Sequence, residues 1–266
     1  MTSSTFSLPS LPRIAPIALL GSLLLGACDD DDKQFSAPAT TYGKSVTIGQ
    51  GSARAYVISS ADGTPTEVGF RMSEGALNGL PTAAGTMYMY DLDLPAAASS
   101  TPFDHVSFNW NPYGHDPLAV YGAPHFDAHF YIQPHAEQHT ITQDDPKGDI
   151  KPDSTLLPVD YVPTPDGTPN RTVEMEGRHW IDRTSPELYG AAFSNTFIYG
   201  SYNGHVTFLE PMLLKSLLTP AVNISAAIKQ PQAYEAKGKY YPTKYTITYD
   251  ATTKEYVIAL REMVRR

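Results

Sequence analysis

The chain has 266 residues, of which 41% are hydrophobic, and a formal net charge of −9. The excess of acidic residues argues against a nucleic-acid-binding protein, because such proteins carry a basic surface. The hydrophobic content is ordinary for a globular protein, and the length suits one large all-β domain or at most two small domains.

The first 27 residues resemble the signal peptide of a bacterial lipoprotein. Arg13 is the only charge before the apolar segment 14–25. About 12 apolar residues are too few to span a bilayer, which needs about 20, but a short apolar segment that ends in small residues is typical of a secretory signal. Leu25-Gly26-Ala27-Cys28 is similar to a lipobox. This resemblance implies a lipidated Cys28 that anchors the chain to a membrane of the cell envelope, on its periplasmic or extracellular face. An ordinary cleaved signal peptide is the alternative.

Residues 28–44 are predicted to form a polar tether. Cys28 is the only cysteine, so no disulfide can form within one chain. Four aspartates follow it at residues 29–32, and such a run of like charges stays solvated. The predicted organisation is therefore a signal peptide at 1–27, a tether at 28–44 and a single β domain at 45–266.

Alternation of apolar and polar residues predicts strands in the first half of this domain. The clearest runs lie at residues 68–72, 87–90 and 106–110. In the last of these, one apolar face opposes one polar face: Val106, Phe108 and Trp110 against His105, Ser107 and Asn109. Such alternation is typical of a strand that is buried on one side.

The segment Pro124-His125-Phe126-Asp127-Ala128-His129-Phe130-Tyr131 concentrates ligand and acid–base side chains among aromatic residues. On a strand, His125, Asp127 and His129 share one face and the apolar residues between them share the other. Residues i and i+2 lie about 6.6 Å apart, whereas i and i+4 lie about 13 Å apart. Asp127 can therefore share an ion with either histidine, but the two histidines cannot share one on a straight strand. A helix is the alternative, since Pro124 and Pro134 would bracket it.

A short helix is predicted from Pro134 to about Thr142. His135 and His139 have i, i+4 spacing there, which can bind a metal, but a solvated helix face is the preferred interpretation. The proline-, aspartate- and glycine-rich residues 144–172 are expected to form the longest loop. Beyond them, His179 stands beside a tryptophan, where it is either a structural residue or a ligand supplied by a separate strand.

Asn203-Gly204 predicts a type I′ turn between two strands. With these two residues as the turn, residues that face each other across the hairpin have numbers that add up to 407. Glu210 then lies opposite Phe197 and shares its face with Phe208, Val206 and Tyr199. A carboxylate on such an aromatic face must be paired, coordinated or protonated. The alternative is an exposed Glu210 that caps a following helix.

That helix is predicted over residues 212–218, because Pro211 suits the first position of a helix. A second hairpin is predicted from strands at 245–249 and 256–260. Together, these patterns predict an all-β fold, an antiparallel β-sandwich or barrel-like domain with one or two short helices.

The histidines and carboxylates together predict a metal-binding or catalytic site. The expected metal ligands are His115, His125, His129 and His179. Asp127 is expected as a ligand or an orienting base, and Glu210 as a ligand or a general acid/base. Nitrogen and oxygen ligands without a thiolate suit a divalent metal such as zinc, or iron, manganese or copper. An open coordination position would make the ion a Lewis acid or a source of hydroxide.

Several motifs resemble the TTHB210-like family, a bacterial domain of unknown function. They span about residues 45–262 and comprise Pro102-Phe103-Asp104-His105-Val106, Trp110-Asn111-Pro112, the segment from Pro124 to Tyr131, His179-Trp180, the strands around Asn203-Gly204, and Tyr240-Tyr241-Pro242-Thr243. Where that family often has Met-Gly before the His-Trp pair, this chain has Glu176-Gly177-Arg178. The resemblance implies an extracytoplasmic β-rich domain that assembles into homo-oligomers, and it implies no particular reaction.

Two functions therefore compete. The first is an envelope lipoprotein with a metal site, as a metal-dependent hydrolase or lyase if it is an enzyme. The second is a non-catalytic envelope protein that binds a small-molecule ligand or assembles with itself, in which the same residues form a buried polar network.

Overall fold

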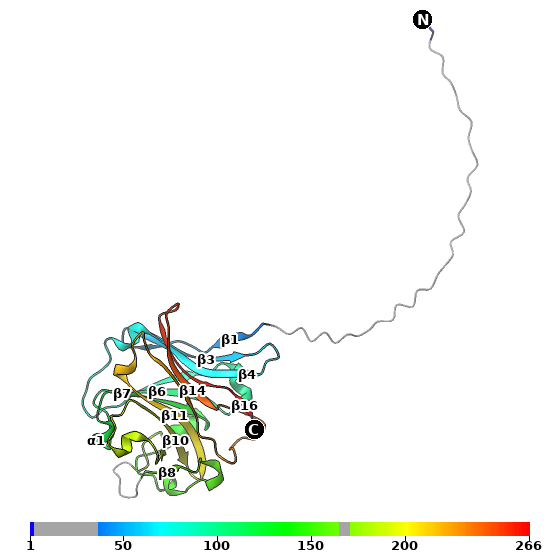
Figure 1. Cartoon of the computed structure of the whole chain (residues 1–266). Helices are drawn as coiled ribbons and strands as arrows, with labels where there is room; N and C mark the ends of the chain where they lie inside the picture. The colour runs from blue at the N-terminus through cyan, green and yellow to red at the C-terminus, as the bar shows by residue number, and fades with distance from the viewer. Residues whose placement is uncertain (3–36, 165–170) are drawn as a thin grey trace, which may run out of the picture. The chain divides into compact units, whose positions relative to one another are not determined.

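The computed structural model describes residues 1–2, 37–164 and 171–266 (Figure 1). The predicted lipobox, Cys28 and the aspartate run lie outside the described residues. The fold described here belongs to the unit Phe35–Arg266. Among the described residues, no helix has the length and apolar character needed to cross a membrane.

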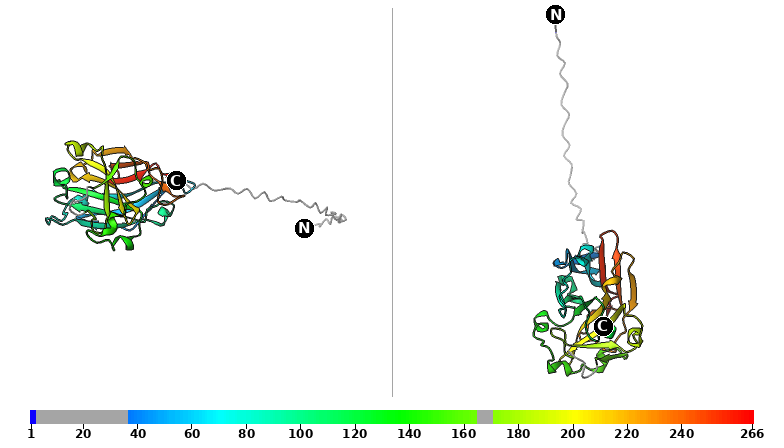
Figure 2. Two further views of the ribbon diagram at one scale, coloured as in Figure 1. Left: turned by 90° about the horizontal axis from the view of Figure 1, so that it is seen from below. Right: turned by 90° about the vertical axis from the view of Figure 1, so that its left-hand side faces the viewer.

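Two antiparallel sheets build this unit, which confirms the predicted all-β sandwich (Figure 1). The first sheet has the order β1-β3-β4-β15-β14-β12, with β2 on β3. Its strands are β1 (Ala39–Tyr42), β2 (Val46–Ile48), β3 (Gly51–Ser59), β4 (Pro65–Ser73), β12 (Asn223–Ala227), β14 (Lys244–Asp250) and β15 (Glu255–Arg261). Figure 2 shows strands from the beginning and the end of the domain, coloured blue and red, within this sheet.

The second sheet has the order β5-β6-β7-β11-β10-β9-β8 and carries the polar residues of interest. Its strands are β5 (Tyr88–Asp93), β6 (His105–Asn111), β7 (His125–Tyr131), β8 (Tyr161–Pro163), β9 (Arg178–Asp182), β10 (Asn195–Tyr202) and β11 (His205–Leu214). Within the described chain, the remaining elements are short. They are the pair β13 (Tyr240–Tyr241) and β16 (Val264–Arg265), the helices α1 (Leu118–Tyr121) and α2 (His135–Gln138), and 3₁₀ turns at Glu74–Leu77, Ala96–Ser100, Pro146–Asp149, Ser154–Leu156, Pro186–Tyr189 and Lys215–Leu217.

The apolar faces of the two sheets pack against each other. Phe70 of β4 lies 4.6 Å from Phe108 of β6, measured between ring centroids, and Phe108 stacks on Phe126 of β7 at 4.7 Å. All three side chains are fully buried. Strand alternation then turns the residues between them to the opposite, outer face of the second sheet.

This outer face is polar and nevertheless buried. On β6 and β7, directly opposed outer residues are Asn109 with Asp127 and Ser107 with His129, and every residue of both strands is buried. The connection at 112–124 and the segment at 171–177 cover it, as the contacts described below show. A sheet with polar side chains on a covered face needs a specific set of partners for them, since unpaired buried polar groups are costly.

Strand β11 corrects two predictions. It continues through Pro211 to Leu214, where a helix over 212–218 was expected. Its register with β10 shifts at Gly200/Ser201, so Glu210 pairs with Ile198 and not with Phe197. The shift arises because Thr207 is an extra residue in β11, a β-bulge that turns Glu210 to the outer face.

Three further segments differ from expectation. Helix α2 ends at Gln138, earlier than the predicted 142. The predicted loop 144–172 contains strand β8. Strand β1 pairs with β3 although it lies within residues 28–44, the predicted tether. The predicted strand at 125–131 and the predicted hairpin of β14 and β15 are both present.

Candidate metal centre

Strand β7 supplies the central residues of a histidine–carboxylate cluster on the outer face of the second sheet. His125, Asp127 and His129 are all buried, with at most 3% of each residue exposed. They alternate with the core residues Phe126 and Ala128, as the sequence pattern predicts. His125 and His129 fall into two different groups of ligand atoms, in keeping with their four-residue separation along a straight strand.

The first group, called the His125 group, consists of His115, His125 and Asp127. His125 Nε2 lies 3.3 Å from Asp127 Oδ1, and His115 Nε2 lies 3.5 Å from Asp127 Oδ2. Asn111 donates to Asp127 Oδ2 at 2.6 Å. The carboxylate of Asp127 is thus held between two imidazoles and one amide.

Backbone carbonyl groups orient both imidazoles of the His125 group. His125 Nδ1 lies 2.7 Å from the oxygen of Ala123, and His115 Nδ1 lies 2.9 Å from the oxygen of Asp116. A carbonyl oxygen only accepts, so each Nδ1 carries the hydrogen. Each Nε2 then either binds a second proton or offers its lone pair to a cation, which is the usual arrangement of metal-binding histidines.

The second group, called the His129 group, consists of His129, Glu176, His179 and Glu210. His179 Nε2 lies 3.3 Å from Glu176 Oε2 and 3.6 Å from Glu210 Oε2. His129 Nε2 lies 3.5 Å from Glu210 Oε2 and 3.8 Å from Glu176 Oε1. Asn109 donates to Glu176 Oε1 at 2.7 Å.

Four separate elements bring the His129 group together. His129 lies on β7, Glu210 on the neighbouring strand β11, and His179 on β9, opposite Gly200 of β10. Glu176 comes from the covering segment, where Met175 and Gly177 on either side of it have positive φ angles of 60° and 90°. This double turn points the Glu176 side chain back onto the sheet, and the Tyr131 hydroxyl fixes the turn by donating to the oxygen of Met175.

Several buried polar atoms of the two groups have no hydrogen-bond partner. They are His125 Nε2, Asp127 Oδ1, both ring nitrogens of His129 and Glu210 Oε2. Each buried polar atom left in this state costs about 1–3 kcal/mol. One cation per group would satisfy the Nε2 and carboxylate atoms, because they belong to sets of ligand atoms that face one another, and it would leave His129 Nδ1 as it is.

The three carboxyl groups affect one another's charge. Burial by itself raises the pKa of Asp127, but the contacts with His125 and His115 outweigh it and hold the pKa well below its ordinary value. The pKa of Glu176 is lowered in the same way, because its two histidine neighbours outweigh burial. Burial, and then the negative charges of Asp127 and Glu176, raise the pKa of Glu210 well above its ordinary value.

The imidazoles respond to the same surroundings. Burial opposes the protonation of His115, but the hydrogen bond and charge of Asp127 prevail and raise its pKa to about 9. Burial lowers the pKa of His129 despite the charge of Glu176. His129 is therefore a neutral imidazole at neutral pH, the form in which histidine binds a metal.

The donor sets match known metal chemistry. The His125 group offers two imidazoles and one carboxylate, and the His129 group offers two imidazoles and two carboxylates. Two histidines with a carboxylate bind catalytic zinc and non-haem iron, and leave coordination positions open for water or substrate. The side chains of His115 and His179 are 41% and 17% exposed, so solvent reaches the cluster past them.

The structure brings all six predicted site residues to this one face. It excludes the alternative of an exposed Glu210, which is 1% exposed. Of the neighbours predicted for Glu210, Phe208 contacts His129 on the outer face, whereas Val206 and Tyr199 belong to the core. His105 joins neither group, because its ring nitrogens bond to Asp104 and Gln138.

Sequence reasoning missed Glu176, Asn109 and Asn111. The two asparagines could have been found, since alternation places them on the polar face of β6. The sequence signal for Glu176 was weaker. It is a carboxylate three residues before His179, and it lies in a segment that departs from the TTHB210-like pattern.

These features define a β-sandwich protein with a histidine–carboxylate cluster on one covered sheet face. The family described as "TTHB210-like: Hypothetical protein TTHB210" matches residues 60–110. This match confirms the resemblance over β4 to β6, whereas β7, β9 and β11 lie outside the matched segment. Searches of curated proteins and of solved structures find no match.

Proposed function

We propose that the protein binds divalent transition-metal ions on the outer face of its second sheet. The carrying observation is the set of buried Nε2 and carboxylate oxygen atoms that lack a hydrogen bond in two adjacent histidine–carboxylate groups. One ion in the His125 group and one in the His129 group would satisfy them. Zinc suits both donor sets, and so do iron, manganese and copper.

The residues present define what each side chain would do. His125 and His129 would be buried ligands supplied by β7, and His115 and His179 would be ligands on the solvent-exposed side of the cluster. Asp127 and Glu210 are carboxylate ligands, and Asn111 and Asn109 orient Asp127 and Glu176 by donating to them. When bound, the metal supplies a Lewis acid, which supports a hydrolase or a lyase as the class of enzyme.

Metal analysis of untagged protein tests the proposal. Wild type is expected to retain about two equivalents after dialysis, and His125→Gln and His179→Gln are each expected to lose one, because each removes a ligand from one group only. His205→Gln is the matched control, since His205 is exposed and pairs with Glu235 outside both groups. Equal stoichiometry in all four proteins would refute the metal centre.

A purely structural polar network is the second candidate. The hydrogen bonds from Asn109 and Asn111 to buried carboxylates favour it, since they stabilise the cluster without a metal. On this alternative, the protein is a ligand-binding or self-assembling envelope component. Wild type would then contain no stoichiometric metal, added zinc would leave its melting temperature unchanged, and light scattering would report a defined oligomer.

We further propose that lipidated Cys28 anchors this domain to a bacterial envelope membrane. The lipobox resemblance and the single cysteine support this location. Assembly of the domain into homo-oligomers is a further proposal, which rests on the TTHB210-like resemblance alone.

A further inference from the structure

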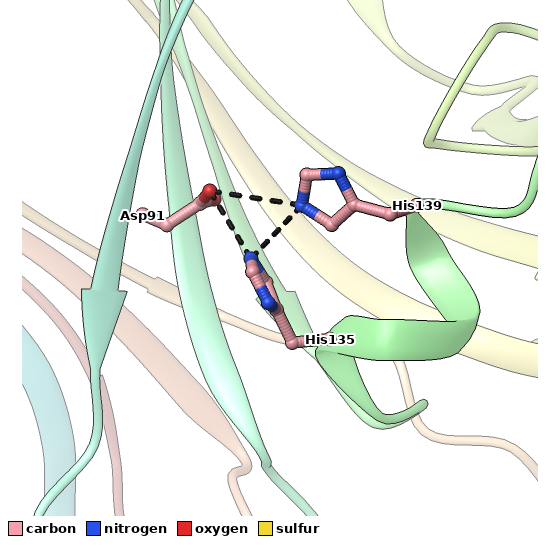
Figure 3. Close-up of side chains that lie close together, drawn as sticks. All are labelled: Asp91, His135 and His139. Carbon is pink, nitrogen blue, oxygen red and sulfur yellow. Dashed lines mark hydrogen bonds and ion pairs between the residues drawn. The ribbon is translucent and has the colours of Figure 1, made fainter.

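Another histidine–carboxylate cluster lies away from the proposed metal centre, at the edge of the second sheet. Figure 3 shows Asp91 on β5, His135 at the start of α2 and His139 directly after its end, with their side chains pointing toward one another. β5 is the terminal strand of its sheet. The three side chains, called the α2 site, are between 33% and 47% exposed.

The α2 site has the dimensions of a metal-binding tripod. The Nε2 atoms of His135 and His139 lie 3.0 Å apart, and they lie 3.2 Å and 3.9 Å from Asp91 Oδ2 (Figure 3). Tetrahedral zinc has bonds of about 2.0–2.2 Å to such atoms, which places neighbouring ligands about 3.3 Å apart. The three observed separations bracket this value.

Hydrogen bonds alone satisfy the α2 site poorly. His135 Nε2 is close to both an imidazole nitrogen and a carboxylate oxygen, but it carries one hydrogen at most. If that hydrogen points at Asp91, it does not point at His139. If His139 donates to His135 Nε2 instead, that nitrogen carries no hydrogen, and it faces Asp91 Oδ2 as one acceptor faces another. A cation at the centre attracts all three lone pairs at once.

Neighbouring groups hold the ligands in place. Ser107 donates to Asp91 Oδ1 at 2.5 Å, which leaves Oδ2 for the site. The backbone N–H of His135 donates to Asp104 Oδ1 at 3.1 Å, and the Gln138 side chain bonds His105 Nε2 at 2.7 Å. The α2 turn is therefore fixed to β6, and such supporting bonds are characteristic of built metal sites.

We infer that Asp91, His135 and His139 form a separate, solvent-facing site for one divalent transition metal such as zinc, copper or nickel. Two imidazoles and one carboxylate leave at least one coordination position to water. Because the site is exposed, its ion exchanges with free chelators faster than ions in the buried centre. The inference is independent of the proposed centre, since the two share no ligand.

Copper and zinc titrations of untagged protein test this inference. Wild-type protein is expected to bind one rapidly exchanging equivalent, with two nitrogen ligands visible in the electron paramagnetic resonance spectrum of bound Cu²⁺. The variant His135→Gln/His139→Gln is expected to lose that equivalent, with at least a tenfold weaker affinity for it. His205→Gln serves again as the exposed-histidine control.

Two results would overturn the inference: equal binding in wild type and the double variant, or an equal loss in the control. Histidine-ring ¹⁵N spectra supply a second readout, since zinc must shift His135 and His139 Nε2 directly. Repeating the titration in His125→Gln/His179→Gln separates the two proposals. The α2 equivalent must remain there even if the buried centre binds nothing. Circular dichroism shows that each variant is folded.

Discussion

The folded structure disfavours the ionised form of the Glu210 carboxyl group. It is 1% exposed, and burial together with the charges of Asp127 and Glu176 raises its pKa well above the ordinary 4.5. Above pH 4.5, the unfolded chain releases this proton while the metal-free native chain keeps it. The unfolded state then binds fewer protons, so the contribution of Glu210 to stability falls as pH rises.

Glu210→Gln should therefore stabilise the metal-free protein, by an amount that grows from pH 5 to pH 8. Gln keeps the shape of the side chain and removes the proton that must be retained. Melting temperatures of wild type and variant, both treated with chelator, measure this difference. Added zinc should reverse the order, since Gln is a poorer ligand. A variant that is less stable than wild type at every pH without metal would contradict the argument.

Gly200 controls the position of an aromatic ring within the His129 group. A Cβ at this position would overlap the ring of Phe208, which contacts His129 at 4.7 Å and His179 at 5.4 Å between centroids. Gly200→Ala should displace Phe208, cost about 1–3 kcal/mol of folding free energy, and weaken metal binding by about 10–100-fold.

Denaturant unfolding and zinc titration measure the two effects of Gly200→Ala. Adding Phe208→Leu removes the overlapping ring and should recover part of the loss, which a double-mutant cycle detects as coupling. Additive effects of the two substitutions would mean that the ring and the glycine act independently.

Residue-level prediction from sequence succeeded where a local rule decides the outcome. Alternation on β7 predicts which side His125, Asp127 and His129 face, and the structure agrees. Glu176 could not be placed in this way. Its position depends on positive φ angles at Met175 and Gly177 and on a bond from Tyr131, a residue distant in the sequence.

At the scale of elements, the turn between β10 and β11 follows its sequence closely. Asn203 and Gly204 have φ angles of 51° and 84°, as a type I′ turn requires. A Cβ on Gly204 would meet no atom closer than 3.4 Å, so a substitution there is opposed by backbone conformation alone.

Gly204→Ala should destabilise the domain by about 1–2 kcal/mol, the cost of a left-handed conformation for a residue with a Cβ. Asn203→Gly should change stability much less, because both residues occur readily in this turn. Urea unfolding midpoints with unchanged slopes measure both variants. If Gly204→Ala leaves the midpoint unchanged, the turn does not contribute as argued.

In β11, the strand that follows this turn, the sequence predicts the cross-strand pairs only near the turn. Numbering from the turn predicts the pairs nearest to it, Tyr202 with His205 and Ser201 with Val206. The bulge at Thr207 then shifts all later pairs, and it leaves no local sign in the sequence. Pro211 suits the start of a helix, but the neighbouring strands keep it in β11. Leu209 and Met212 pair with β7, whereas Glu210 and Pro211 do not, as expected where a backbone N–H is missing.

For the whole molecule, the second sheet divides the domain into two environments. Its inner face builds the apolar core with the first sheet, and its outer face holds buried polar groups under covering segments. The proposed metal centre and the α2 site both lie on that outer side, at the middle and at the edge of one sheet. The same β-strand alternation thus produces the core and both candidate sites.

The predicted lipid anchor also concerns the whole molecule, because it would determine the compartment in which the proposed metal centre lies. Cys28→Ser should abolish acylation, since the serine hydroxyl cannot replace the thiol that lipidation requires. Metabolic labelling with a fatty acid and partition into detergent measure the effect in cells that express the full chain. Wild type should be labelled and partition with detergent, whereas Cys28→Ser should do neither. Ser36→Ala, beyond the lipobox, is the control and should behave as wild type. An unlabelled wild-type chain in the aqueous phase would favour an ordinary cleaved signal peptide over an anchor.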